Sequence, residues 1–305
     1  MEQNLGDLAY VCPGCRAPLV VSAGHCGACY FPIELTEHGF LRVPGDSFLD
    51  QDHTLVVQAL AAGNLRYYDK DERINRQFIL KFSVPLIERL FGNRRDVRIL
   101  SVGSGIGIDV EILRELGYQA WGTDCGSRCL VWPQRAQPEY LAQCADEHMP
   151  FADGFFDFVM CHQVLEHIGV VGDSIVVQPN SREIRQRFLD NLVRVTRLGG
   201  YINVATPNRT FPLDPGHAPN FFGVRVHGPL DRFLSSYGDM RSYFAKHDFE
   251  PLTPANYYAG TFASRAGRLG ELFARYIRFL DRHPSLQGTF LNPLTNVLVH
   301  KVAGA

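Results

Sequence analysis

Short apolar runs and amphipathic stretches alternate through the middle of the chain. The runs at 96–102, 118–123, 140–145, 155–161 and 201–206 predict strands, and the helical periods at 110–116 and 182–196 predict helices. Strands that alternate with helices are typical of a parallel sheet covered by helices on both faces. The pattern therefore predicts an α/β fold.

The C-terminal third continues the pattern with a helix at 230–246, a strand at 251–258, a helix at 265–279 and a strand at 296–302. The second helix lies between the last two predicted strands, so it is an insertion over about 262–285. It carries a basic face of four arginines: Arg265, Arg268, Arg275 and Arg278. We expect this face to be solvated, and contact with an anionic substrate is the alternative.

Residues 54–91 also have a helical period, which Gly63 and Asn64 interrupt. Tyr67 and Tyr68 lie at this break, where core packing is favoured over stacking on a ligand. We therefore divide the chain into an N-terminal module at 1–45, a linker with two helices at 46–95 and a main domain at 96–305.

Four of the eight cysteines fall within the first thirty residues, as two C-x-x-C pairs: Cys12, Cys15, Cys26 and Cys29. Two such pairs supply four thiolates, which suit a closed tetrahedral zinc site, whereas unrelated buried thiols would rarely repeat the spacing. A module of this size cannot bury a sufficient core, so we expect structural zinc to stabilise it. His25 is a less favoured substitute ligand.

The charge balance argues against a nucleic-acid partner. The formal net charge is −2, and residues 1–50 hold six acidic and two basic residues. The N-terminus has no signal-peptide pattern, and no uncharged apolar run reaches 18 residues. We therefore expect a cytoplasmic protein without a membrane span.

A glycine-rich turn follows the first predicted strand of the main domain. It reads Gly103-Ser104-Gly105-Ile106-Gly107, and glycines there let the backbone approach a ligand closely. A dinucleotide site requires G-x-G-x-x-G, but Ile108 occupies the position of its last glycine. The turn instead fits the G-x-G-x-G pattern of S-adenosylmethionine sites, which leaves a dehydrogenase as a minor alternative.

Acidic residues follow the next two strands. Asp124 follows the second strand, where a carboxylate accepts hydrogen bonds from ribose hydroxyls, and Asp146 follows the third. His162 and Gln163 follow the fourth strand and open a predicted helix. These positions all fall at the carboxyl ends of strands, where open α/β sheets bind ligands.

Residues 96–208 resemble class I S-adenosylmethionine-dependent methyltransferases through the segments ILSVGSGIGID, WGTD, CADEHMPFADGFFDFVMCHQVLEHI and LGGYINVATPN. The resemblance implies a Rossmann-like sheet of seven strands with the last strand antiparallel. Ser101 stands where many members of the family carry an acid. The implied cofactor-binding residues are Gly103, Ser104, Gly105, Gly107, Asp124, Cys125, Asp146, Glu147, His162 and Gln163.

The N-terminal module resembles the small zinc ribbons of the Trm112 type that precede bacterial methyltransferases. The ribosomal guanine-N1 methyltransferases also carry an N-terminal zinc module. This position favours an RNA substrate, whereas the acidic charge of the module opposes it.

The loop at 207–229 follows the fifth strand and is rich in proline and phenylalanine. Because such loops line the ligand crevice, we predict His217 as the general base that accepts the acceptor's proton. A histidine bonded to the loop backbone is the structural alternative, and His227 is a weaker candidate.

A divalent metal at Glu166 and His167 with a later histidine is another alternative, because some methyltransferases of RNA ends and quinone precursors use a Glu-x-x-Glu-His pattern. Gln163 replaces the first acid of that pattern here, which weakens a site for hard cations. Otherwise Glu166 and His167 only anchor the segment after the fourth strand.

The favoured hypothesis is an S-adenosylmethionine-dependent enzyme that methylates an oxygen of a small molecule or glycan. Methylation of base amines or glutamine is disfavoured because the chain lacks an Asn/Asp-Pro-Pro-Tyr turn after the fourth strand. The alternatives are a ribosomal or transfer RNA methyltransferase and a degenerate methyltransferase fold that acts as a binding or scaffold protein.

Overall fold

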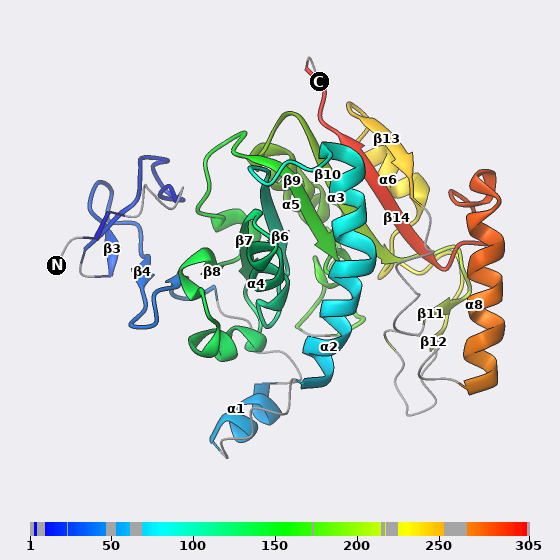
Figure 1. Cartoon of the computed structure of the whole chain (residues 1–305), viewed down its shortest axis with the longest axis horizontal. Coiled ribbons are helices and arrows are strands. Elements are labelled where there is room, and N and C mark those ends of the chain that lie inside the picture. Colours follow the sequence, from blue (N-terminus) through cyan, green and yellow to red (C-terminus); the bar gives the residue numbers. More distant parts are fainter. Residues whose placement is uncertain are drawn as a thin grey trace.

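The computed structural model describes residues 3–4, 10–22, 24–46, 53–61, 69–172, 174–214, 217, 225–252 and 267–303. A central sheet runs through the molecule, with the N-terminal module at one end and helix α8 (Gly267–Asp281) at the other (Figure 1). Within the described residues, no helix has the length and apolar character needed to cross a membrane.

The central sheet contains nine strands in the described part of the chain, in the order β13-β14-β10-β9-β6-β7-β8-β5-β4. Strands β6 to β10 and β5 are parallel to one another, and β14 is antiparallel to both of its neighbours. The bounds are β6 Arg98–Val102, β7 Gln119–Asp124, β8 Leu141–Gln143, β9 Phe156–His162, β10 Thr196–Pro207, β13 Asp248–Pro251 and β14 Leu294–His300. These are the seven strands expected of a Rossmann-like methyltransferase sheet with an antiparallel last strand.

The sheet is longer than predicted because the N-terminal module adds two strands to it. Strand β5 (Leu41–Arg42) pairs in parallel with β8, and β4 (Glu34–Leu35) pairs antiparallel with β5. The pairing of Leu41 with Ala142 joins segments about a hundred residues apart, which is why local patterns did not reveal it. Tyr10, almost fully buried, also stacks on Phe151 at 5.4 Å between ring centroids.

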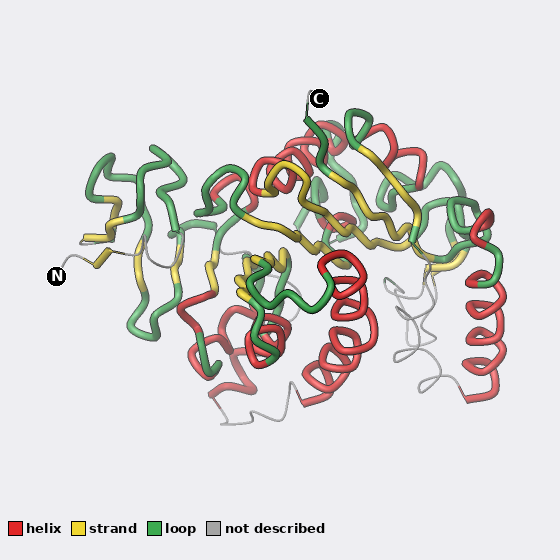
Figure 2. The backbone as a smooth tube through the Cα atoms, turned by 45° about the horizontal axis from the view of Figure 1, so that its top comes forward, coloured by secondary structure: helices red, strands yellow, loops and turns green. Residues whose placement is uncertain are grey.

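The rest of the module is a small antiparallel sheet of β1 (Gln3–Asn4), β2 (Val20–Ser22) and β3 (His25–Cys26). The module lies beside the edge of the sheet next to β8 (Figure 2). The module and main domain therefore share one continuous sheet, in addition to being joined by a linker.

Alternate residues of the strands pack on opposite faces of the sheet. Leu100 and Val159 belong to a core with helices α5 (Ser181–Val195) and α6 (Tyr237–Tyr243). Ile99 and Phe158 belong to a second core with α3 (Val84–Phe91) and α4 (Ile108–Glu115). The helices thus cover both faces, as the alternating pattern predicted.

The predicted pair of helices is present as α1 (His53–Ala61) and a longer helical segment. That segment consists of α2 (Asp69–Phe78), a π-helical stretch over Ile79–Ser83 and α3. Ile79, Phe82 and Leu86 bury one side of it against the sheet. Tyr67 and Tyr68 lie outside the described residues.

The C-terminal elements differ in extent from their predictions. Only Tyr237–Tyr243 of the predicted helix at 230–246 is α-helical, because Ser236 and Asp239 form a capping box that starts it there. The sixth strand is Asp248–Pro251 rather than 251–258, and residues 253–266 are outside the described part. The inserted helix α8 is followed by a short turn at Pro284–Leu286. Arg265 and the side chain of Arg268 are not among the described groups.

Short 3₁₀-helical segments also lie between the parallel strands of the described part, at Ser127–Gln134, Pro138–Tyr140, Asp146–His148 and Leu165–His167. The last one replaces the helix predicted to open at His162, because β9 extends through that residue.

Candidate functional site

The turn after β6 depends on the absence of a side chain at its first residue. Gly103 has a φ of +74°, and a Cβ added there would lie 2.1 Å from Cγ2 of Val164. The amides of Gly103 and Ser104 both donate to the carbonyl of Thr123, at 2.8 and 3.0 Å. The turn is thereby attached to the end of β7, so the loops after these two strands face the same space.

That space is a cavity of about 650 Å³ at the carboxyl ends of the parallel strands. Seven of the predicted cofactor-binding residues line it: Gly103, Gly105, Asp124, Cys125, Asp146, Glu147 and Gln163. Loops from β6, β7, β8 and β9 all contribute, which is where ligands of open α/β sheets bind. Three predicted residues, Ser104, Gly107 and His162, are not among its lining residues.

Asp124 connects the two loops next to the cavity. One carboxylate oxygen accepts the amide hydrogen of Gly105 at 2.8 Å, and the other accepts that of Gly126 at 2.7 Å. Beneath the glycine turn, Trp132 is fully buried and donates from Nε1 to the carbonyl of Gly105 at 2.8 Å. The carboxylate is therefore held in place while it borders the cavity.

Asp109 is a buried carboxyl that the sequence did not mark. The hydroxyl of Ser101 donates a hydrogen bond to it, and burial raises its pKa to about 6. Asp109 thus lies beside Ser101, the position at which the resemblance to methyltransferases leads us to expect an acid. It belongs to the first turn of α4 rather than to β6.

Asp146 and Asp46 lie at the end of the cavity formed by β8. Burial, followed by the nearby charge of Glu147, raises the pKa of Asp146. Asp46 comes from the linker after the N-terminal module, and its Oδ2 accepts the amide hydrogen of Ala145 at 2.8 Å. Nδ1 of His148 lies 2.9 Å from the same oxygen. Gly45 and Asp46 also line the cavity, so the linker contributes part of its wall.

Gln163 and His162 are adjacent but face different surroundings. Gln163 has a φ of +57°, which is uncommon for a residue other than glycine and marks a constrained turn beside the cavity. His162 points into the core, where it packs edge-on against Phe78 and its Nε2 lies 2.6 Å from Oδ1 of Asn203. Burial lowers the pKa of His162 to about 4, so this ring is neutral.

Ser104 and Gly107 belong to the turn but do not line the cavity. Gly107 has a φ of +77° at the start of α4, and a Cβ there would lie 2.9 Å from Cδ1 of Leu141. Ser104 is buried, and its hydroxyl has no hydrogen-bond partner within the described residues.

His217 lies in a second cluster beside the cavity. Its Nδ1 lies 3.0 Å from the carboxylate of Asp214, a fully buried residue on β11 (Leu213–Asp214), which pairs with β12 (Arg225–Val226). Burial lowers the pKa of His217, but the Asp214 carboxylate outweighs this effect and raises it above the ordinary value. The ring of His227 instead lies near its own backbone, with Nδ1 3.3 Å from the carbonyl of Gly228.

Two residues of the turn after β9 face His217. Nε2 of His217 lies 3.5 Å from Nε2 of His167, and His167 lines the cavity. Glu166 is buried and belongs to the same group, in which one potential ligand atom of each residue lies within 4.8 Å of the others. Phe221 and Phe222 of the loop at 207–229 lie outside the described residues.

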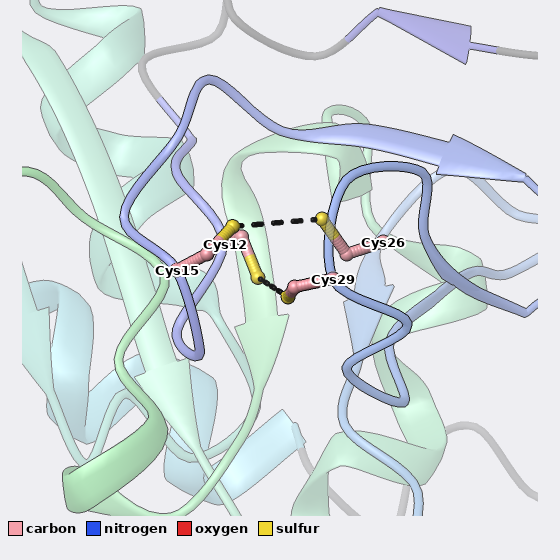
Figure 3. Close-up of side chains that lie close together, drawn as sticks. All are labelled: Cys12, Cys15, Cys26 and Cys29. Atoms are coloured by element: carbon pink, nitrogen blue, oxygen red, sulfur yellow. Dashed lines mark hydrogen bonds between the residues drawn. The ribbon is translucent and has the colours of Figure 1, made fainter.

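The four N-terminal cysteines converge on one point (Figure 3). Sγ of Cys12 lies 3.5 Å from Sγ of Cys29, and Sγ of Cys15 lies 3.9 Å from that of Cys26. Four sulfurs at zinc-binding distance form a tetrahedron with edges of about 3.8 Å. The arrangement therefore has the size of a four-thiolate zinc site.

The local backbone favours the thiolate form at Cys26, whereas burial raises the pKa of Cys12 to about 12. Burial raises the pKa of Cys26, but the amide groups of Ala28 and Cys29 outweigh it and lower the pKa to about 7. His25 does not join the group, because its ring packs against Tyr30 and its Nδ1 lies 3.3 Å from the carbonyl of Cys26.

Comparison with known proteins finds a protein family that the central part of the chain matches. Residues 100–204 match the family model described as a methyltransferase domain. A search of curated proteins finds no match.

Solved structures similar to the chain include methyltransferases from several organisms. One is phosphoethanolamine N-methyltransferase 2 from Haemonchus contortus in complex with S-adenosyl-L-methionine, which is 14% identical to this chain with a TM-score of 0.42. The match covers 72% of this chain and 52% of that protein, so this chain spans about half the length of that methyltransferase. An S-adenosylmethionine-dependent methyltransferase from Mesorhizobium loti is 12% identical with a TM-score of 0.43 and coverages of 71% and 96%. The complex between the Haloferax volcanii Trm112 methyltransferase activator and a methyltransferase gives 11% identity, a TM-score of 0.45 and coverages of 79% and 96%.

The matched residues contain the end of β6, all of β7 to β9, the glycine turn and both acids that follow β7 and β8. Apart from Gly45 and Asp46, the residues that line the cavity also fall within the matched part. The chain therefore contains a methyltransferase domain in its central part, at residues 100–204.

Proposed function

We propose that the cavity beside the glycine turn binds S-adenosylmethionine. The main support for this proposal is that three features face the same cavity. These are the turn at Gly103, which has no side chain there, and the carboxylates of Asp124 and Asp146 at neighbouring strand ends. Asp124 would accept hydrogen bonds from the ribose hydroxyls, and Asp146 would meet the adenine amino group. Gly105, Cys125, Glu147 and Gln163 would line the bound cofactor.

Asp46 supports the adenine end of this proposed site. Its carboxylate holds the amide of Ala145, immediately before Asp146, and contacts the ring of His148. The ring of Phe31 in the N-terminal module also packs edge-on against His148, at 5.3 Å between centroids. The N-terminal module would therefore help to position the residues that contact the cofactor.

We propose that Cys12, Cys15, Cys26 and Cys29 hold a structural zinc ion. Because all four ligands come from the protein, the ion would have no open position for a substrate. It would stabilise the small module, which stacks on Phe151 and pairs with β8.

We propose that the enzyme methylates an oxygen of a small molecule or glycan. When bound, S-adenosylmethionine supplies a methyl group attached to a positively charged sulfur. His217 would accept at Nε2 the proton that the acceptor hydroxyl loses, because Asp214 holds Nδ1 as the protonated nitrogen. The N-terminal module is acidic, which disfavours contact with the phosphates of RNA.

The Asp46→Ala variant tests the link between the module and the cofactor site. Loss of the bond to Ala145 should loosen the adenine end and weaken binding of S-adenosylhomocysteine about tenfold, equivalent to ~1.4 kcal/mol. Calorimetric titration measures this, with Glu37→Gln as an exposed acidic control from the same module. Equal affinities of both folded variants and the wild type would contradict the positioning role of Asp46.

Metal analysis tests the zinc site. The purified protein should contain about one zinc per chain that survives desalting, and the cobalt-substituted protein should show thiolate-to-metal charge-transfer absorption. Both signals should disappear in Cys12→Ser/Cys26→Ser and persist in Cys125→Ser. Retention of these signals in the double variant would place the metal elsewhere.

The His217→Ala variant tests the general base. It should reduce kcat by about a hundredfold or more, the usual contribution of a positioned base, while leaving the affinity for S-adenosylhomocysteine unchanged. Formation of S-adenosylhomocysteine with a panel of small phenols and sugars measures the rate. His227→Ala is the matched control and should keep the wild-type kcat. An unchanged kcat in His217→Ala would remove this residue from the mechanism.

A further inference from the structure

Glu166, His167 and His217 bring a carboxylate and two imidazoles together at the edge of the cavity. Glu166 and His167 are held by the turn Leu165–His167 after β9, and His217 comes from the loop after β10. His217 is 50 residues from His167 in sequence, yet the potential ligand atoms of all three residues are within 4.8 Å of one another. This group differs from the four-cysteine site in its chemistry and in its contact with the cavity.

The orientation of the His217 ring directs a lone pair into this group. The carboxylate of Asp214 lies 3.0 Å from Nδ1, so that nitrogen carries the proton and Nε2 is free of it. Metal-binding histidines typically have this arrangement, with the second nitrogen bonded to a carboxylate. Phe233 packs edge-on against the ring at 4.8 Å and helps to hold it.

Glu166 provides an independent sign that a cation belongs here. The residue is 1% exposed, and its Oε2 accepts a hydrogen bond from the hydroxyl of Thr206 at 2.8 Å. Its Oε1 is buried and has no hydrogen-bond partner within the described part of the chain. Leaving a carboxylate oxygen buried without a partner is costly, and a bound cation would remove that cost.

We propose that Glu166, His167 and His217 form a binding site for a divalent first-row transition ion, with Asp214 orienting His217. Two nitrogens at zinc-binding distance in a tetrahedral site lie about 3.4 Å apart, close to the 3.5 Å between the two Nε2 atoms. Imidazole ligands suit ions such as Fe²⁺, Ni²⁺ and Zn²⁺, and the carboxylate of Glu166 also suits Mn²⁺, whereas Mg²⁺ and Ca²⁺ prefer sites built from oxygen ligands.

Three protein ligands leave a position open on the ion, as in catalytic rather than structural metal sites. His167 lines the cofactor cavity, so this position is near the space in which methyl transfer is proposed. An acceptor hydroxyl bound to the ion would release its proton to solvent more readily, and its oxygen would form the new bond to the methyl carbon as the carbon–sulfur bond breaks. This proposal modifies the proposed function in one respect: with the ion bound, the Nε2 lone pair of His217 would hold the metal and would not accept the proton of the acceptor.

Titration of the zinc-loaded full-length protein with Mn²⁺, followed by the loss of the free-ion electron paramagnetic resonance signal, tests the site. Mn²⁺ does not compete well for four thiolates, so the N-terminal zinc remains in place. We expect one saturable Mn²⁺ site that an equal concentration of Mg²⁺ does not occupy. Glu166→Gln and His217→Ala should each weaken it at least tenfold, while His227→Ala leaves it unchanged.

Binding of S-adenosylhomocysteine to each variant shows that it is folded and reports on the cofactor site separately. Absence of saturable Mn²⁺ binding in the wild type, or equal binding in the wild type and both variants, would overturn the proposed metal site. Because the titration requires no methyl acceptor, its failure would leave the proposed transfer to oxygen standing, and failure of that transfer would not affect the metal result.

Discussion

The close approach of the backbone at Gly103 is the constraint on which the site depends. Any side chain at this residue would collide with Val164, which belongs to the loop after β9. The same turn is bonded through two amides to the end of β7. Three strand ends are thereby brought around one cavity, and Asp124 reinforces the arrangement by bridging Gly105 and Gly126. The backbone of this turn therefore positions the polar groups that face a ligand.

The N-terminal module also contributes to the site, because its strands β5 and β4 extend the sheet at the edge next to β8. Pairing of β5 with β8 places the following linker beside the carboxyl end of β8, so Asp46 reaches the amide of Ala145. A zinc-stabilised module would in this way influence a cavity built mainly by another domain. The two proposed metal sites would then have separate roles, because the four thiolates enclose their ion and the Glu166 cluster borders the cavity.

Local sequence patterns predicted the parts of the molecule that depend on short stretches of chain. The glycine turn, the acids at strand ends and the paired cysteines each have a spacing that a single segment determines. Asp46 could not be found in this way, because its partner Ala145 is 99 residues away and only the β5–β8 pairing brings them together. The bond between Asp214 and His217 is different, because the two residues are three positions apart and their pairing was a local signal that the sequence analysis did not use.

The placement of His162 shows that one local signal was missed. Phe158 and Met160 pack in the core with α3 and α4, whereas Val159 and Cys161 face the opposite core. Since side chains alternate along a strand, His162 falls on the face of Phe158 and Met160 once β9 is extended by one residue. The helix predicted to start at His162 concealed this, and the ring lies in the core rather than beside the cavity.

Calorimetric titration with S-adenosylhomocysteine shows whether the cavity beside the Gly103 turn is the cofactor site. We expect micromolar binding by the wild-type protein and a loss of binding in Asp124→Ala, whose carboxylate lies at the cavity edge. Absence of binding by folded, zinc-loaded wild-type protein, or undiminished binding by Asp124→Ala, would contradict this assignment of the site.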